Sequence, residues 1–174
     1  MSHSPVSHSI LRAADLGERI ATDRVVLDYE DRFLRRKMLT SVGGTEFLVD
    51  LPETLSLNHD DCFVIGDTLI AVEAAEEALI EVRGHDLVRL AWHIGNRHTP
   101  CQIMSDRLLI RQDKVMADML AKLGAQVSEI TAPFRPEGGA YGMGRTHGHD
   151  HSHVHVHVGH GHSHDHEDEG DEPL

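Results

Sequence analysis

The sequence predicts a mixed α+β protein: a small N-terminal all-β domain, then a ferredoxin-like βαββαβ domain and a disordered histidine-rich tail. Three observations lead to this prediction. Short apolar runs separated by turn residues fill residues 10–75, which is typical of a small β domain. Two helical patterns then alternate with strands. The tail holds ten histidines and few apolar side chains, so it has little to bury. We expect domains at residues 1–76, 77–145 and 146–174.

The N-terminal domain is predicted to consist of short strands. They cover residues 24–27, 37–40, 46–50, 62–65 and 69–72. The third of these is expected to end before Pro52, because proline cannot donate a backbone hydrogen bond. Gly66-Asp67 is a strong hairpin signal between the last two strands. Residues 1–9 are rich in serine and histidine, and we expect them to be frayed.

The following stretch predicts strands at residues 78–82, 102–104, 108–110 and 125–130, with one helix after the first and one after the third. The first helix is expected from His85 to about Ile94, with an apolar face made of Leu87, Leu90, Ala91 and Ile94. The second is capped by Asp113 and ends before Gly124, with an apolar stripe of Val115, Met116, Met119, Leu120 and Leu123. This order places both helices on one face of a four-stranded sheet. From Pro133 onward we expect a linker.

Charge and composition exclude several classes of protein. The formal net charge of -13 opposes binding to phosphate backbones, so we expect no nucleic-acid partner. No run of 18 apolar residues is present, so no membrane helix is expected. Charged residues interrupt the first thirty positions, which argues against a secretory signal. The two cysteines, Cys62 and Cys101, provide no disulfide framework and suit a reducing, cytoplasmic location.

The tail is the clearest candidate for metal binding. Its histidines are His147, His149, His151, His153, His155, His157, His160, His162, His164 and His166. Imidazole suits Ni(II) and also Zn(II) and Cu(II), which are expected to compete in vitro. Alternate residues of an extended chain lie about 7 Å apart, so many interchangeable sites are expected. The alternative is an affinity tag or an incidental polar tail, but a tag would be contiguous histidine.

Other candidate ligands lie in the body of the chain. His93 and His98 are five positions apart, about 140° around a helix, so they cannot form a helical chelate pair. Cys101 is a weak candidate ligand and is more simply a buried small side chain. We interpret Cys62 as a strand residue and His59 as a solvated loop residue. Motifs of hydrolases and nucleotide-binding enzymes are missing, so we predict a protein that is not an enzyme.

Several segments together resemble one family. Residues 90–100, LAWHIGNRHTP, resemble the H-[LI]-G-N-R-H-x-P signature of UreE-type urease accessory proteins. Residues 44–52 resemble the family's N-terminal segment ending in L-D-L-P, and residues 66–69, GDTL, lie between strands as in that family. Residues 134–141, FRPEGGAY, resemble its F-x-P-E-x-G-A-Y segment. The resemblance covers about residues 10–166 and includes a histidine-rich tail.

The resemblance implies a nickel metallochaperone with a peptide-binding-like N-terminal domain and a ferredoxin-like metal-binding domain. It implies a homodimer that binds nickel at its interface through the last histidine of GNRH, which is His98. It further implies that nickel passes to the urease apoprotein–accessory complex through the GTPase UreG. Residues 111–114, RQDK, lack the histidines that some relatives carry there, so no secondary metal site is expected in that segment.

Two other functions remain open from the residues alone. A metal-dependent hydrolase would use His93 and His98 and would need fixed carboxylate ligands. A metal buffer or sensor would use the tail only to store nickel or zinc. Activation of apo-urease distinguishes a chaperone from both.

Overall fold

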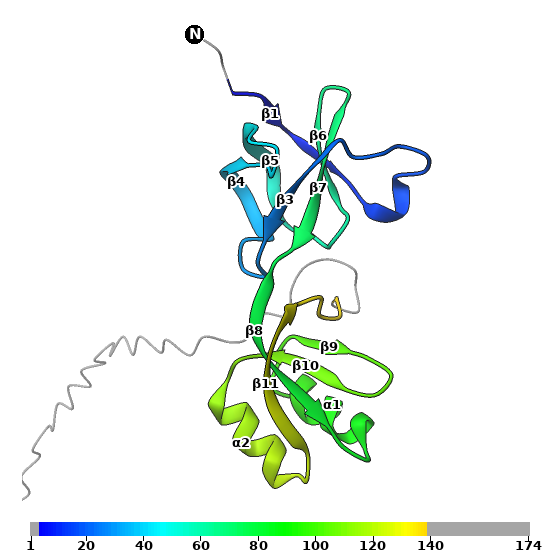
Figure 1. The fold of residues 1–174 in the computed structure, drawn as a ribbon, viewed down its shortest axis with the longest axis vertical. Helices are drawn as coiled ribbons and strands as arrows, with labels where there is room; N and C mark the ends of the chain where they lie inside the picture. The colour runs from blue at the N-terminus through cyan, green and yellow to red at the C-terminus, as the bar shows by residue number, and fades with distance from the viewer. Residues whose placement is uncertain (1–3, 139–174) are drawn as a thin grey trace, which may run out of the picture.

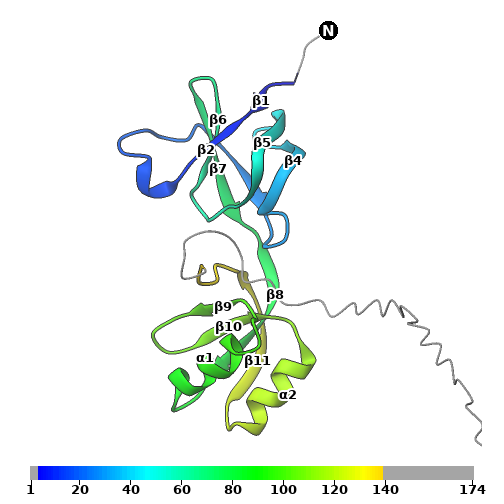
Figure 2. The ribbon, with the colours of Figure 1, turned by 180° about the vertical axis from the view of Figure 1, so that it is seen from behind.

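The structure is a computed structural model that describes residues 4–138, and the predicted tail lies outside this range. Within it the chain is mixed α+β, dominated by strands and with two α-helices, as predicted. No helix among the described residues is long and apolar enough to cross a membrane. Figures 1 and 2 show the strands of residues 6–74, the N-terminal unit, at one end, and the elements of residues 76–133, the C-terminal unit, at the other.

The N-terminal unit contains two sheets that pack on a shared core. β1 (Val6–Ser7), β5 (Glu46–Ser56) and β4 (Phe33–Thr40) form a sheet in that order. The second sheet has the order β2 (Ser9–Leu11), β6 (Cys62–Ile65), β7 (Thr68–Ala74) and β3 (Asp23–Leu27). Phe47 and Phe63 come from different sheets and meet edge to face, with ring centroids 5.5 Å apart. The predicted hairpin between β6 and β7 is present, with Gly66 at φ 57°.

Two predictions for this unit are wrong. The described part of the first segment is not frayed, because Val6 and Ser7 pair in parallel with Leu48 and Val49, and Ser7 is fully buried. β5 also does not end before Pro52 but continues to Ser56. Proline is tolerated there because the β4–β5 register shifts between Leu34 and Arg36, so no ladder hydrogen bond is needed from Pro52.

The C-terminal unit has the predicted βαββαβ order. It consists of β8 (Glu76–Arg83), α1 (Leu87–Gly95), β9 (Cys101–Ile103), β10 (Leu108–Arg111), α2 (Lys114–Lys122) and β11 (Gln126–Pro133). The sheet order is β11-β8-β10-β9, and all neighbouring strands are antiparallel. Only Ala75 separates β7 from β8, so the chain passes directly from one unit into the other (Figure 1).

Both helices begin and end at the signals that the sequence contains. Asp113 caps α2, since its carboxylate accepts a hydrogen bond from the Met116 N–H at 3.0 Å. Asp86 caps α1 in the same way, by accepting from the Arg89 N–H at 3.0 Å. The helix therefore starts at Leu87, two residues after the predicted His85. Gly124 follows α2 with φ 89°, as expected of a C-terminal glycine.

The sheet of the C-terminal unit is buried on both faces by different partners. Ile80 and Val82 of β8 pack against both helices, in one cluster with Leu90 and Leu120. Side chains alternate along a strand, so Leu79 faces the opposite side. There it packs with Leu109, Phe134 and Tyr29. Tyr29 belongs to the N-terminal unit, so this second cluster joins the two units.

Polar contacts reinforce the junction. The Tyr29 N–H donates to a Glu77 carboxylate oxygen at 2.9 Å, and the rings of Tyr29 and Phe134 meet edge to face at 5.3 Å. The buried Arg32 guanidinium donates to the Phe134 carbonyl oxygen. The prediction of a linker from Pro133 onward is therefore wrong for its first residues, because Phe134 is a core side chain with no exposed surface.

Candidate metal centre

His98 lies just beyond the C-terminal end of α1. The chain continues past the last helical residue through a tight turn, in which the Arg97 N–H donates to the Ile94 carbonyl at 3.1 Å and the His98 N–H donates to the Gly95 carbonyl at 2.9 Å. His98 has φ 55°, a left-handed conformation that few non-glycine residues adopt and that is often found at functional sites. The residue is exposed and is held on a rigid base, because Ile94 of the same turn is fully buried.

His93 is positioned differently, as the helical angle predicts. It lies inside the last turn of α1, is partly buried, and meets Trp92 edge to face with centroids 5.0 Å apart. His98 lies outside the helix, so the two residues are not a chelate pair on one helix face. His93 also suits a structural role, because its ring packs against Trp92 in the last turn of α1.

Cys101 begins β9 and packs against the core between the sheet and the helices. Burial raises the pKa of its thiol to about 11, with a smaller contribution from Glu137. The thiol is therefore protonated at neutral pH, whereas metals bind the thiolate. Cys62 is buried in β6, and burial raises its pKa as well. Both positions favour the structural interpretation of the cysteines.

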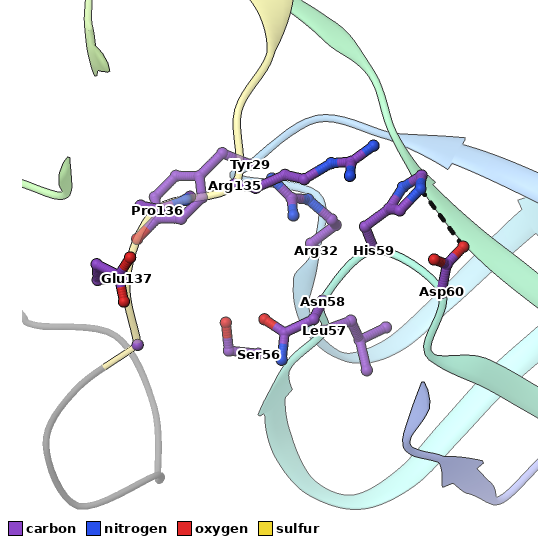
Figure 3. A pocket seen from close by; sticks show the side chains of 11 residues that line it. Tyr29, Arg32, Ser56, Leu57, Asn58, His59, Asp60, Arg135, Pro136 and Glu137 are labelled. Atoms are coloured by element: carbon purple, nitrogen blue, oxygen red, sulfur yellow. Dashed lines mark ion pairs between the residues drawn. The ribbon is translucent and has the colours of Figure 1, made fainter. Parts of the chain in front are cut away.

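His59 is not the solvated loop residue that we expected. Its side chain is 23% exposed, and its Nδ1 accepts a hydrogen bond from the Ala74 N–H at 3.1 Å. Nδ1 therefore carries no proton, which places the proton of the neutral ring on Nε2. That atom lies 3.4 Å from the Asp60 carboxylate (Figure 3). Neither ring nitrogen offers a metal a lone pair while these contacts hold. The partner residue is distant in sequence, so no local pattern signalled this arrangement.

Within residues 4–138, no three histidine, cysteine, aspartate or glutamate side chains come together around a common point that could hold a metal ion. Asp113, the acidic residue of the RQDK segment, is already engaged in capping α2. Among the described residues of one chain, His98 is thus an exposed candidate ligand just beyond a helix end, with no cluster of further ligands around it. The ten predicted tail ligands, His147 to His166, lie outside the described residues.

Comparison with known proteins decides the family. The family model for the UreE urease accessory protein, C-terminal domain, matches residues 77–168, and the model for its N-terminal domain matches residues 7–75. The chain belongs to the UreE family. It is 57% identical over 145 residues to the urease accessory protein UreE of Ruegeria pomeroyi, a match covering 83% of this chain and 96% of the relative. The UreE of Rhodobacter capsulatus is 58% identical over 129 residues, covering 74% of this chain and 82% of the relative.

The resemblance drawn from the GNRH segment is confirmed by these matches. The function that it implies, a nickel metallochaperone in urease maturation, is confirmed with it. The hydrolase alternative receives no support from the site, since His93 and His98 lack a converging set of carboxylates among the described residues.

Proposed function

We propose that this UreE protein binds Ni(II) at a site shared by two copies of the chain, and that it delivers the ion to apo-urease. The observation that carries the proposal is the position of His98, which is exposed at the end of a helix whose inner face is fixed in the core. A ligand on such a base keeps its geometry without a surrounding pocket. The role is that of a carrier with no catalytic step of its own.

The outer face of α1 supports a dimer around this site. Val88 and Trp92 lie one helical turn apart, and they are 82% and 63% exposed. Large apolar side chains this exposed are typical of interfaces, where tryptophan is enriched. A two-fold axis beside this face places the same surface of each chain against the other. The His98 residues at the two helix ends then approach one another and supply one imidazole each.

The start of the tail supports a contribution from the tail histidines. The Glu137 N–H donates to the Cys101 carbonyl at 2.9 Å. This bond anchors the segment after β11 at Cys101, which follows His98 by three positions in the sequence. The ten residues that follow Glu137, up to His147, span at most about 33–36 Å when extended. Tail histidines therefore have the reach to complete a shell that two imidazoles leave unsaturated, while further tail histidines hold additional ions.

The other expected roles complete the proposal. We divide the chain into an N-terminal β domain (1–76) that binds partners, a metal-binding domain (77–145) and a metal-binding tail (146–174). Partners are a second copy of the chain, the GTPase UreG and the urease apoprotein–accessory complex in the cytoplasm. Nickel is the cargo. Zn(II) and Cu(II) are competitors, because imidazole sites alone do not exclude copper.

Removing the tail is expected to lower metal capacity without unfolding the body. Ending the chain at Tyr141 removes ten histidines and leaves every described strand and helix intact. We expect the truncated protein to lose more than one equivalent of nickel per dimer, while the melting temperature of the metal-free protein stays nearly unchanged. Calorimetric nickel titration and thermal unfolding of both forms measure the two effects. A large fall in metal-free stability would contradict the prediction.

Nickel binding is expected to fail below neutral pH. Imidazole binds a metal only when it is neutral, and its unperturbed pKa is about 6.5. Protons therefore compete increasingly as the pH falls through that value, and most tail-bound nickel should be lost by about pH 5. Equilibrium dialysis across pH 5 to 8 measures the loss. Full stoichiometry at pH 5 would instead indicate sites dominated by the acidic residues of the tail.

Activation of apo-urease tests the delivery role. With limiting nickel, together with UreG and the other accessory proteins, the full chain should raise the yield of active urease. The rival role of metal buffer is favoured by the number of tail histidines, and it predicts a different result. A buffer would lower the yield by withholding nickel, and a histidine-rich peptide of the tail alone would act as well as the whole protein.

A further inference from the structure

A polar cavity of about 310 Å³ lies between the two units, away from His98. Three separate stretches line it: Tyr29 and Arg32, residues 56–60, and residues 135–138 (Figure 3). The last stretch belongs to the FRPEGGAY segment, which contains none of the proposed nickel ligands. A volume of roughly 300 Å³ is at the lower end of known small-ligand pockets. We propose that this cavity binds a carboxylate side chain of a partner polypeptide, so that an acidic peptide segment docks at the junction.

The cationic side of the cavity is formed by two arginines. Figure 3 shows the guanidinium groups of Arg32 and Arg135 on the same side as the His59 ring. Arg32 is 3% exposed, and its Nε donates to the Asp28 carbonyl at 3.2 Å. The backbone of Arg135 is fixed, because its N–H donates to the Gln102 side chain at 2.7 Å. Among the described residues, no carboxylate lies within ion-pair distance of the Arg135 guanidinium. A planar guanidinium prefers a carboxylate or phosphate, which it binds through two parallel hydrogen bonds.

The acidic side chains that line the cavity favour a carboxylate over a phosphate as its ligand. Asp60 and Glu137 lie at opposite ends of the cavity, so its lining has two arginines and two carboxylates. The His59 ring adds no charge while its Nδ1 accepts a hydrogen bond from the Ala74 N–H. A dianionic phosphate is disfavoured in such surroundings. A singly charged carboxylate is better matched, because the backbone N–H groups beside it in a peptide can donate to Asp60 and Glu137. The charge pattern therefore fits an acidic peptide.

A partner bound here contacts both units at once. Residues 56–60 belong to the N-terminal unit, whereas residues 135–138 follow β11 of the C-terminal unit. A partner at this site therefore recognises the two units in their docked arrangement. This inference goes beyond the nickel role and does not depend on it, since no lining residue is a proposed nickel ligand.

The test is a titration of the isotope-labelled full chain, followed by the amide signals in nuclear magnetic resonance spectra. The probes are a blocked tripeptide with a central aspartate, the same peptide with asparagine, and inorganic phosphate. The aspartate peptide should produce saturable shifts at residues 56–60 and 135–138. Arg135→Ala should weaken this binding by about tenfold or more, as expected when a hydrogen bond between charged groups is lost. Arg19→Ala removes the same charge from an exposed loop outside the cavity and should leave binding within about twofold.

Three results would overturn the proposal. They are an absence of saturable shifts at the cavity, equal binding of the asparagine peptide or of phosphate, and an equal loss of affinity in Arg19→Ala. Nickel titration of Arg135→Ala separates this inference from the metal role. The Arg135→Ala variant should keep its nickel stoichiometry. Failure of the peptide to bind would therefore leave the proposed nickel site standing. Failure of the unmodified chain to bind nickel would likewise leave the proposed peptide site standing.

Discussion

Replacing His98 with alanine is expected to abolish the tightest nickel site, which holds a single ion per dimer, while the tail sites remain. The reason is geometric. His98, the proposed ligand, is exposed just beyond the end of α1, and in a two-fold dimer a single substitution removes two imidazoles at once. The measurement is calorimetric nickel titration of a chain ending at Tyr141, with and without the substitution, and with the mass of the complex determined in parallel. The truncation is needed because tail sites would otherwise mask the loss.

His93→Ala is the matched control. It deletes the same side chain five positions earlier, in the helix and beside Trp92, so it should keep the single nickel per dimer with little change in affinity. If His98→Ala retains that nickel with unchanged affinity, the interfacial site lies elsewhere. If the two substitutions have equal effects, His93 is a ligand as well, and the distinction drawn from the end of the helix is wrong.

The helices and the hairpins of this fold could be predicted because their signals are local. Asp113 and Gly124 delimit α2 through contacts within a few residues of themselves, and the apolar spacing of α1 identifies its buried face. The order of strands and helices in the C-terminal unit follows from such signals together with the handedness of connections. The position of His98 was also predictable in part, since Gly95 and Asn96 mark the end of the helix just before it.

The predictions failed where the deciding contact is distant in sequence. β1 exists because two residues near the N-terminus pair with Leu48 and Val49, and so short a strand has no periodicity to detect. His59 is held by the Ala74 backbone, which no local pattern indicates. The cavity at the junction combines three stretches, and only the arrangement of the two units brings Arg135 near His59. Binding surfaces between domains are therefore the least accessible to sequence reasoning.

Phe134→Ala is expected to destabilise the protein by about 3–5 kcal/mol, the usual cost of emptying a buried phenylalanine site. Phe134 has no exposed surface. It packs in one cluster with Leu79, Leu109 and Tyr29, and its ring meets the Tyr29 ring at 5.3 Å. The lost side chain would leave a cavity under the face of the sheet that the helices do not cover. Denaturant unfolding of the metal-free protein, followed by circular dichroism, measures the change.

Val115→Ala is the matched control, because it also shortens an apolar side chain but at a position that is 77% exposed. Its cost should stay within about 0.5 kcal/mol. Phe134 also joins the two units, so its loss should expose the junction before the rest of the chain unfolds. Hydrogen exchange should therefore accelerate first at Tyr29 and Arg32, whose N–H groups are bonded to Glu77 and to Asp28. A cost below about 1 kcal/mol, well under the usual range for a buried phenylalanine, would mean that the residues after β11 do not belong to the core.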